Sequence, residues 1–523
     1  MIDLDAIKTV ADISRVMAAR QPDVTAQIFD GRETTYGELD RRASQVANGL
    51  IAEGIAPDSR VGAIGKNSDY YFEILLGACK ARGVVVGVNW RLAAPEVEYV
   101  LNDAKVEVLF VGAEFADLIA QIAANVPTLR KIIAIDGGHA DWPAFTDWRD
   151  AQDDADPMIP IAAGDDVIQL YTSGTTGHPK GVQLTNANYS AVFQQAIDSG
   201  WADWDQNDVN FVCMPLFHVA GVNVGLLGLA QGTKNVILKD VDPGVIIELV
   251  ETHGVTILFM VPAVILFVLS HPNCADANLS TVRMVIYGAS PIAQDLLEKA
   301  KARFGCPFTQ VYGLTETTGS ATYLPDEDHA PERGKLRSCG KPNPGTEIRC
   351  VDDAGKDVPQ GAVGEILIRH SAVMKGYWNR SDATAEAIDG DGWFRSGDAG
   401  YFDEEGYLYI HDRVKDMIVS GGENVYPAEV ENALFSHPKV ADVAVVGVPS
   451  ERWGEAVHAV VVPAPGEEVS EADIIAFAKE KIAGYKVPKS VTFIEALPRN
   501  PSGKVLRREL RAPYWEGHDR QVN

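Results

Sequence analysis

The sequence predicts an α/β protein with a large N-terminal domain of parallel or mixed sheets flanked by helices, followed by a small α+β C-terminal domain. Three observations support this prediction. Residues 24–270 alternate short β-branched runs with longer helical patterns, the pattern changes to alternating strands and Gly/Asp turns after about residue 340, and a compact α+β pattern follows residue 412. The chain has 523 residues, enough for more than one domain.

The first 270 residues contain strand–helix–strand units. Strands and helices alternate over residues 60–65, 70–81, 84–88, 94–103 and 106–111. Units of this length are typical of parallel sheets covered by helices. The most apolar stretch, residues 255–269, contains Pro262 and is shorter than the ~20 residues of a membrane span. We therefore expect a buried strand that continues into a buried helix.

The pattern beyond residue 340 predicts alternating strands with Gly/Asp turns and then the α+β unit. Short strands are expected at 364–369 and 406–410, next to Gly or Asp turns. After the charged segment 412–416 we expect, in order, a helix, two strands and a helix over residues 427–435, 440–446, 457–462 and 474–483. Ser470 and Asp473 form the capping-box pattern that precedes the last helix.

The charge distribution supports a boundary after residue 412, which gives domains 1–412 and 413–523. Residues 413–523 contain 14 Lys/Arg and 16 Asp/Glu, a net charge of −2, which leaves −25 for the first 412 residues. The smaller part ends in a basic cluster of Arg499, Lys504, Arg507 and Arg508. We expect a small domain that brings positive charge to an anionic site on a large acidic one.

Composition excludes several classes of partner and site. The net charge of −27 argues against nucleic acid or an anionic membrane surface as the main partner. The six cysteines are far apart and indicate buried thiols in a reducing compartment. Because the N-terminus lacks the features of a secretory signal, we expect a soluble cytoplasmic protein without a transmembrane segment. The oligomeric state stays open, and a homodimer is among the alternatives.

Residues 171–182 carry the strongest chemical signal, a loop suited to binding phosphate. Glycines let backbone N–H groups turn toward an anion, hydroxyls add donors and a lysine supplies charge. The pattern lacks the spacing of a Walker A loop. The residues that we expect to contact the nucleotide are Thr172, Ser173, Gly174, Thr175, Thr176, Gly177 and Lys180.

This loop resembles the signature of the acyl-adenylate-forming (AMP-binding) superfamily, which includes acyl-CoA synthetases, adenylation domains of peptide synthetases and luciferases. Seven further segments match the family in order and spacing: 215–218, 287–290, 310–316, 393–398, 412–416, 420–427 and 498–504. The resemblance covers residues 24–512. It implies that the part after residue 340 contains a small β-barrel-like subdomain and that the C-terminal domain is mobile.

The resemblance implies an acid–thiol ligase that uses ATP, coenzyme A and Mg²⁺. A carboxylate attacks the α-phosphate of ATP to give acyl-AMP and pyrophosphate, and a thiol then displaces AMP. Such chemistry needs positioning and charge stabilisation, with no covalent enzyme intermediate. By the same resemblance, Lys504 bridges the carboxylate and α-phosphate oxygens during adenylation.

Further site residues are carried over from the family motifs. Glu316 and Thr172 match the positions that hold Mg²⁺, and Thr315 matches a phosphate contact. Asp398 and Arg413 match the ribose contacts. The adenine pocket corresponds to Gly288, Ala289, Ser290, Gln310 and Tyr312.

The acyl and thiol sites follow from the same comparison. His218 matches a gate above the acyl tunnel, and the small neighbours Ala220 and Gly221 are expected to leave open space beside it. The rest of the predicted acyl pocket is Gly288 and Gly313. Lys415 matches the hinge about which the small domain swings, bringing Ser420, Gly421 and Gly422 to the site for thioester formation. Lys486 and Lys489 are either contacts for the phosphates of CoA or solvated surface charges.

The preferred interpretation is a carboxylate–CoA ligase acting on medium- or long-chain fatty acids. An arylpropenoate CoA ligase of the coumarate or ferulate type is a second interpretation. A third is an adenylation enzyme that loads a carrier protein. A fourth, from another class, is an inactive nucleotide-binding regulatory protein. The residues favour an apolar or aryl acid of some length over acetate.

Overall fold

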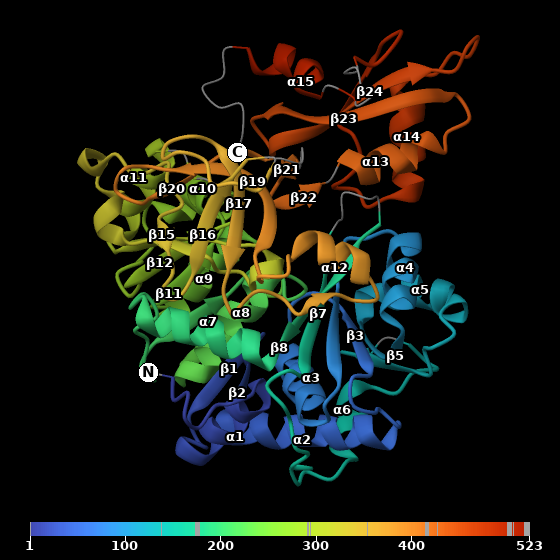
Figure 1. Ribbon diagram of the computed structural model, residues 1–523. Coiled ribbons are helices and arrows are strands. Elements are labelled where there is room, and N and C mark those ends of the chain that lie inside the picture. The colour runs from blue at the N-terminus through green and yellow to red at the C-terminus, as the bar shows by residue number, and fades with distance from the viewer. Residues whose placement is uncertain are drawn as a thin grey trace.

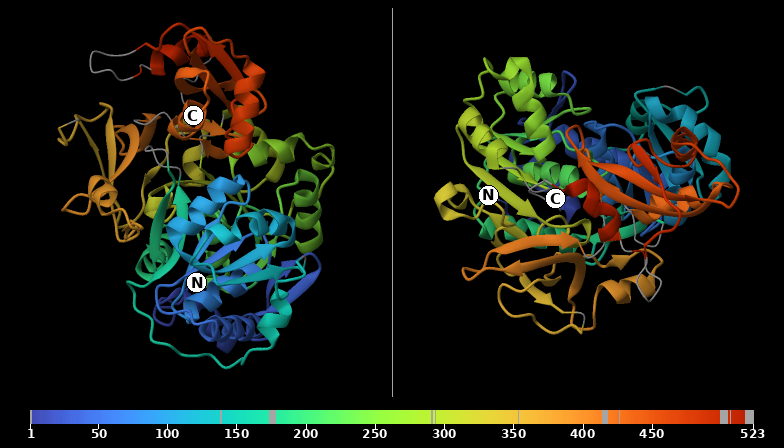
Figure 2. Two further views of the ribbon diagram at one scale, coloured as in Figure 1. Left: turned by 90° about the vertical axis from the view of Figure 1, so that its right-hand side faces the viewer. Right: turned by 90° about the horizontal axis from the view of Figure 1, so that it is seen from above.

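The computed structural model describes residues 2–137, 139–172, 178–289, 292, 294–352, 354–413, 418–425, 427–498, 505 and 507–516. Its larger part contains two extended sheets with helices, and a smaller unit follows residue 417. Figures 1 and 2 show this unit, coloured orange to red, at the opposite end of the molecule from the N-terminal helices α1 (Val10–Arg20) and α2 (Tyr36–Ala52). The predicted α/β fold class is confirmed.

A seven-stranded sheet carries the predicted strand–helix–strand units, and its parallel strands are nearly fully buried. The strands in spatial order are β18 (Gly376–Tyr377), β8 (Lys180–Thr185), β7 (Asp166–Thr172), β4 (Val84–Val88), β3 (Arg60–Ile64), β5 (Val106–Gly112) and β6 (Lys131–Ile135). The helices of this region are α3 (Tyr70–Lys80), α4 (Ala94–Ala104), α5 (Ala116–Ile122) and α6 (Phe145–Asp150). The bounds of β3, α3, β4, α4 and β5 agree with the sequence predictions to within one residue.

A second sheet has nine strands. In spatial order they are β15 (Lys341–Pro342), β14 (Thr322–Leu324), β13 (Phe308–Tyr312), β12 (Met284–Gly288), β11 (Ile257–Met260), β9 (Val209–Val212), β10 (Lys234–Ile237), β1 (Thr25–Phe29) and β2 (Arg32–Thr35). The helices along this part of the chain are α7 (Asn186–Asp198), α8 (Val219–Gln231), α9 (Pro243–His253), α10 (Pro262–Ser270) and α11 (Gln294–Phe304).

The apolar stretch at 255–269 forms β11 followed by α10, as predicted. Among the described residues, no helix is long and apolar enough to cross a membrane. Helices α3 and α8 are apolar on nearly all sides and pack against each other in the core. A Cβ added at Gly225 of α8 would lie 2.1 Å from Cζ of Phe72 in α3, so this contact requires glycine.

The region after residue 340 forms an antiparallel sheet in the open order β16 (Glu347–Val351), β17 (Gly364–Arg369), β19 (Phe394–Phe402) and β20 (Leu408–Arg413). It occupies the place of the predicted barrel-like subdomain. Helix α12 (Ser381–Ala387) precedes β19. Short 3₁₀ turns complete the larger part, at Ala113–Phe115, Ala123–Asn125, Pro272–Cys274, Thr315–Thr317, Asp326–His329 and Pro331–Arg333.

The smaller unit is α+β, as predicted. Its strands are β21 (Ile418–Ser420), β22 (Glu423–Val425), β23 (Val440–Ser450), β24 (Gly454–Pro463) and β25 (Ser490–Phe493). Its helices are α13 (Pro427–Phe435), α14 (Glu471–Lys481) and α15 (Arg507–Trp515). The predicted capping box is present, because Asp473 N donates to Ser470 Oγ and Ser470 N donates to Asp473.

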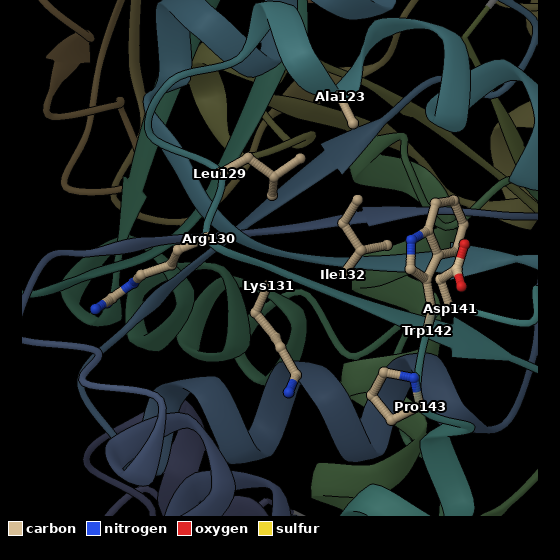
Figure 3. A pocket seen from close by; sticks show the side chains of 8 residues that line it. All are labelled: Ala123, Leu129, Arg130, Lys131, Ile132, Asp141, Trp142 and Pro143. Carbon is tan, nitrogen blue, oxygen red and sulfur yellow. The ribbon is translucent and has the colours of Figure 1, made fainter.

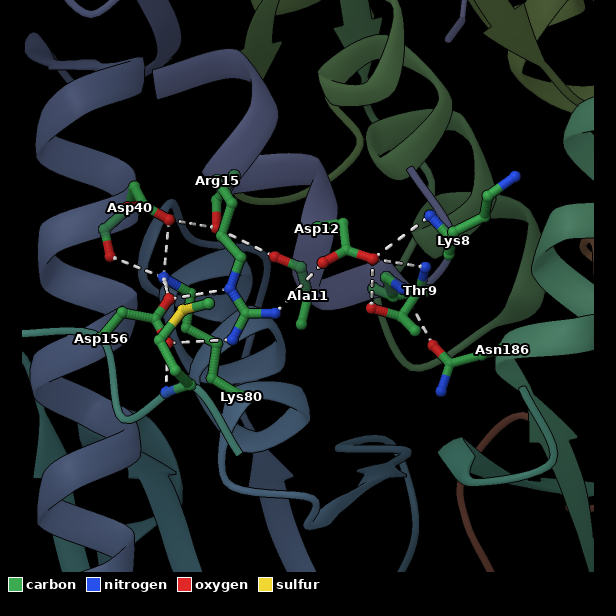
Figure 4. Close-up of polar contacts among 12 residues, drawn as sticks. Lys8, Thr9, Ala11, Asp12, Arg15, Asp40, Lys80, Asp156 and Asn186 are labelled. Atoms are coloured by element: carbon green, nitrogen blue, oxygen red, sulfur yellow. Dashed lines mark hydrogen bonds and ion pairs between the residues drawn. The ribbon is translucent and has the colours of Figure 1, made fainter. Parts of the chain in front are cut away.

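A polar cluster ties the N-terminal helices together (Figure 4). Lys80 of α3 is fully buried and its Nζ lies 2.6 Å from Asp40 Oδ1 and 2.8 Å from Asp156 Oδ2. Arg15 of α1 binds the same Asp156 at 2.8 Å. Burial alone would raise the pKa of Asp156, but Arg15 and Lys80 hold it well below its usual value.

Lys80→Met should therefore lower the free energy of unfolding by about 3 kcal/mol at pH 7, because it leaves Asp40 without its buried cation and Asp156 with Arg15 alone. Chemical denaturation monitored by circular dichroism measures this. The control Lys8→Met removes an exposed ion pair to Asp5 and should change stability by less than about 0.5 kcal/mol. Equal stability of Lys80→Met and the parent would contradict the assigned role.

Candidate active site

The predicted phosphate loop joins the antiparallel strands β7 and β8. Their register pairs Thr172, at the end of β7, with Lys180, at the start of β8. The strands predicted before and after the loop are thus confirmed. Residues 173–177 lie outside the described residues.

Helix α4 braces both sides of this loop. Tyr171 donates from its hydroxyl to Asp103 Oδ2 at 2.7 Å, and Tyr99 donates to the Pro179 carbonyl at 3.2 Å. The Tyr99 ring also stacks on His178, with ring centroids 5.0 Å apart. Arg380 Nη2 completes the brace through a 2.7 Å bond to Asp103. One helix therefore fixes the chain on both sides of the phosphate loop.

Glu316 lies beside Thr172, as expected for two ligands of one cation. The Thr172 hydroxyl donates to Glu316 Oε1 at 3.3 Å, and the Tyr377 hydroxyl donates to the same oxygen at 3.0 Å. Strand β18 brings Tyr377 here because it pairs with β8 at the edge of the sheet. Burial raises the pKa of Glu316, although its own backbone, Tyr377, Thr172 and Lys180 oppose the effect.

The donor set suits a hard cation. Magnesium prefers oxygen ligands and, next to phosphates, uses only one or two carboxylates from the protein. Glu316 supplies a buried carboxylate and Thr172 a hydroxyl, within one hydrogen bond of each other. Lys180 lies near the same carboxylate, with its Nζ 4.9 Å from the centre of the Tyr377 ring. The described residues around Thr172 and Glu316 therefore fit Mg²⁺. Tyr377 was not singled out from the sequence.

Asp398 and Tyr312 meet at a second point of the site. The Tyr312 hydroxyl donates to Asp398 Oδ2 at 2.7 Å, and Asp398 is 3% exposed. Asp398 pairs with Arg413 in the register of β19 and β20. The predicted aromatic and carboxylate residues are thus in direct contact. A carboxylate in this position can accept hydrogen bonds from a diol.

The end of β12 carries a strained residue where the adenine pocket was predicted. Ala289 follows Gly288 and has φ of +66°, a left-handed conformation that side chains other than glycine seldom adopt. Gln310 lies on the neighbouring strand β13 and is buried, where the Tyr287 hydroxyl donates to its Oε1 at 3.4 Å. Ser290 lies outside the described residues.

The glycines assigned to the acyl pocket are tightly packed. A Cβ at Gly221 would lie 2.4 Å from the Pro215 carbonyl oxygen, one at Gly288 2.4 Å from the Val311 carbonyl oxygen, and one at Gly313 2.4 Å from the Gly319 carbonyl carbon. The expectation that Gly221 leaves open space beside His218 is therefore wrong, because neighbouring backbone fills that space. Ala220 lies next to it on α8 and is partly buried.

His218 contacts the smaller unit. Its Nε2 lies 3.3 Å from Oε2 of Glu423, the first residue of β22, and Arg91 forms an ion pair with the other oxygen of that carboxylate. Burial would raise the pKa of Glu423, but His218 and Arg91 hold it below its usual value. The sequence offered a signal for Glu423, which lies inside the matched segment 420–427. Its pairing with His218 and Arg91 depends on tertiary structure.

The predicted thioester segment forms the turn between β21 and β22. Ser420 is buried, whereas Gly421 and Gly422 are exposed and have φ of +61° and +83°. Gly421 N donates to the Trp453 carbonyl at 2.8 Å. On the other side, a Cβ at Gly422 would lie 3.9 Å from a methyl of Val261 in the larger part. The turn therefore lies at the contact between the two units.

The two lysines considered for CoA have different surroundings. Lys486 is 2% exposed and lies between the carboxylates of Glu96 and Glu429, so it is not a surface charge and cannot meet the phosphates of CoA in this arrangement. Burial raises the pKa of Glu429, whereas Tyr485, Glu429 and Glu96 raise the pKa of Lys486 against the effect of its burial. Lys489 lies near the surface, 5.9 Å from the Trp453 ring centre.

The predicted site residues that fall outside the described residues, and so stay predictions, are Ser173, Gly174, Thr175, Thr176, Gly177, Ser290, Lys415 and Lys504. A surface hollow elsewhere, of about 300 Å³ and lined by Arg130, Lys131 and Trp142, lies at the β6 edge of the seven-stranded sheet (Figure 3). Its two cations bind Glu107 and Glu53. It shares no residue with the predicted site.

Comparison with known proteins identifies the family. The model described as AMP-binding enzyme matches residues 15–378, and the model described as AMP-binding enzyme C-terminal domain matches residues 429–504. The chain belongs to the AMP-binding enzyme family.

This AMP-binding enzyme is similar to curated proteins along its whole length. It is 41% identical over 520 residues to the fatty acid–[acyl-carrier-protein] ligase ScoC of Streptomyces coeruleorubidus, covering 99% of this chain and 98% of that protein. It is 39% identical over 498 residues to feruloyl-CoA synthase of an Amycolatopsis species, covering 95% and 97%. These relatives join acids to thiols, and the AMP-binding enzyme described here is an acid–thiol ligase.

A solved structure with similar domains is o-succinylbenzoate CoA synthetase MenE from Bacillus subtilis, bound with a product analogue. The TM-score is 0.84 at 29% identity, covering 95% of this chain and 97% of that chain. Because the match includes both units, the AMP-binding enzyme has the two-domain architecture of its family.

Tyr377→Phe should make the activity of this AMP-binding enzyme more sensitive to acid. The variant removes a donor to ionised Glu316, so the pKa of this buried carboxyl rises further and the carboxylate expected to bind Mg²⁺ is protonated at higher pH. We expect the ratio of Mg²⁺-dependent pyrophosphate release at pH 6 to that at pH 8 to be about fivefold lower in the variant than in the parent. Steady-state assays from pH 5.5 to 8.5 measure this.

The control is Tyr401→Phe, which removes a hydroxyl from β19, where the ring stacks on Tyr409. Its pH profile should match that of the parent. An unchanged profile for Tyr377→Phe would show that this hydroxyl does not support the ionised form of Glu316.

Proposed function

We propose that this AMP-binding enzyme forms acyl-CoA in two steps, through acyl-AMP, from a medium- or long-chain fatty acid. The observation that carries the proposal is the contact of Thr172 with Glu316 beside the phosphate loop, in a chain that matches a fatty acid ligase over 99% of its length. The function rests on two sets of residues, one for each step.

The first set binds ATP and the carboxylate. The backbone N–H groups and hydroxyls of residues 172–177, with Lys180, hold the phosphates, and Tyr312 orients Asp398 to accept the ribose hydroxyls. Thr172 and Glu316 would hold Mg²⁺, which supplies positive charge to the triphosphate when bound. Lys504, on the small domain, places its ammonium between the carboxylate and the α-phosphate as charge develops.

The second set acts on the thiol. Ser420, Gly421 and Gly422 form the face along which the pantetheine arm reaches the acyl-AMP. Arg452 and Lys489 lie 4.6 and 5.9 Å from the ring centre of Trp453, next to this turn. These cations are suited to the phosphates of CoA. The similarity to MenE bound with its product analogue supports an arrangement of the two units suited to this step.

The proposed two steps require two domains that change their arrangement between the steps. We place the large domain at residues 1–412 and the small mobile domain at 413–523, with the hinge at Lys415. The contact between Glu423 and His218 supports a small domain docked at the acyl gate after adenylation. In the adenylation arrangement, the small domain would instead direct Lys504 toward the site in place of Glu423 and the turn 420–422.

The acyl site favours an apolar acid. His218 follows Phe217, whose ring centre lies 4.4 Å from that of His218 and 6.3 Å from that of Trp90. These aromatic rings favour an aliphatic or aryl chain over a short polar acid. An arylpropenoate is the alternative substrate, because one relative is named feruloyl-CoA synthase.

A carrier protein is the alternative thiol. The relative ScoC is named as a fatty acid–[acyl-carrier-protein] ligase, so a phosphopantetheinyl carrier is a second candidate acceptor. Both acceptors present the same phosphopantetheine arm to the enzyme.

The decisive experiment is a thioester screen with purified enzyme, ATP and Mg²⁺. Fatty acids of 2 to about 18 carbons and cinnamates are each tested with CoA and with a carrier protein. We expect the largest kcat/KM for a medium- or long-chain fatty acid with CoA. A cinnamate optimum would support the arylpropenoate alternative, and transfer only to the carrier would support the ScoC-like one. Absence of carboxylate-dependent pyrophosphate release would favour the inactive regulatory alternative.

Lys504→Ala should slow adenylation about 10²- to 10³-fold while ATP affinity stays within a few-fold, because the lysine acts mainly on the transition state. ATP–pyrophosphate exchange measures the first quantity and equilibrium nucleotide binding the second. Lys489→Ala is the matched control and should leave exchange unchanged. Equal exchange in Lys504→Ala and the parent would refute the catalytic role.

Lys415→Pro should leave adenylation within a few-fold of the parent and reduce thioester formation at least tenfold, because proline restricts the backbone rotation of the proposed hinge. Single-turnover transfer from enzyme-bound acyl-AMP to CoA measures the second step. Transfer at the parental rate would rule out a hinge at this residue.

A further inference from the structure

A buried ion cluster joins the two units at a point separate from the nucleotide contacts. Glu96 lies in α4 of the larger part, whereas Lys486 and Glu429 belong to the smaller unit. Lys486 Nζ lies 2.8 Å from Glu96 Oε1 and 2.5 Å from Glu429 Oε1. The side chains of these three residues are 10%, 3% and 8% exposed, for Glu96, Lys486 and Glu429 respectively. One ammonium therefore neutralises a carboxylate from each unit.

The second oxygen of Glu96 also binds the smaller unit. Ala483 N donates to Glu96 Oε2 at 2.8 Å, and Ala93 N, at the start of α4, donates to the same oxygen at 2.8 Å. Ala483 is 2% exposed and belongs to the hydrophobic cluster formed by β3, β4, β5 and α4. Tyr485 packs against this cluster and accepts a hydrogen bond from Asn89 at 3.3 Å. The segment 483–486 thus packs against the larger part.

Helix α4 is itself fixed relative to the phosphate loop. Tyr99 and Asp103, three and seven residues after Glu96, hold Pro179 and Tyr171 on the two sides of that loop. A contact with Glu96 therefore sets where the smaller unit lies relative to the predicted phosphate loop. The same unit carries Glu423, which contacts His218, and the turn 420–422.

We propose that Glu96 is a positioning residue for thioester formation, holding segment 483–486 on α4 and thereby keeping the smaller unit in the arrangement described here. The inference rests on the proposed two-step function. Separation of the units would expose Glu96 and the Ala483 N–H to water, while Lys486 and Glu429 would remain together. Loss of the Glu96 charge therefore weakens the arrangement for the second step without touching the adenylation residues.

The test uses Glu96→Gln in the full-length enzyme. The amide keeps an oxygen for the N–H of Ala93 and loses the charge that attracts Lys486. We expect transfer from acyl-AMP to CoA to slow about tenfold, with ATP–pyrophosphate exchange within twofold of the parent. The matched control is Glu98→Gln, which neutralises a partly buried carboxylate on the same helix that accepts a hydrogen bond from Asn125. Both half-reactions should stay at the parental rate in the control.

A second variant changes a cluster residue that belongs to the smaller unit. Lys486→Met keeps the cap of α4 and should show the same selective loss, and thermal denaturation checks that each variant is folded. Equal losses in both half-reactions, or no loss in folded Glu96→Gln, would overturn the positioning role. Failure of the proposed function is distinguishable, because the parent itself would then form no acyl-CoA.

Discussion

A carboxylate that is buried on folding needs a cation or several hydrogen-bond donors beside it. The architecture of this acidic chain depends on that requirement. With a net charge of −27, the protein buries acidic groups at its candidate active site and at the contact between its two units. Glu316 relies on two hydroxyls, Asp398 on Tyr312, and Glu423 on His218 and Arg91. In each case the partner comes from a distant part of the chain, so the ion or hydrogen bond also fixes tertiary structure.

This requirement explains how an acidic molecule can accept a triphosphate. The carboxylates nearest the predicted nucleotide are buried and hydrogen-bonded, and burial raises the pKa of Glu316. In the proposed function, the loop would contribute neutral donors and Lys180, while the least acidic part of the chain would contribute Lys504. Local arrangement therefore outweighs net charge where the anion binds.

Local pattern predicted much of the fold and part of the site. The strands at 60–65 and 84–88 and the helix at 427–435 are found within a residue, because periodicity and punctuation by glycine and proline determine them. The segment resemblance assigned Thr172 and Glu316 to one cation, and the structure places them in contact, whereas the contact of Tyr312 with Asp398 was not predicted. The sequence could not show that Lys486 is buried, since its partner Glu96 is 390 residues away. The sequence analysis also expected open space at Gly221, where the structure has close backbone contacts. A small residue is compatible with either.

Helix α4 has a consequence for recombining parts between related ligases. Its surface carries the partner of the Ala483–Lys486 segment and, a turn further on, the supports of the phosphate loop. A C-terminal portion taken from a homologue would have to form the same contacts with this helix. The natural unit of exchange is thus the C-terminal portion together with the matching face of α4, even though the two are separated by most of the polypeptide.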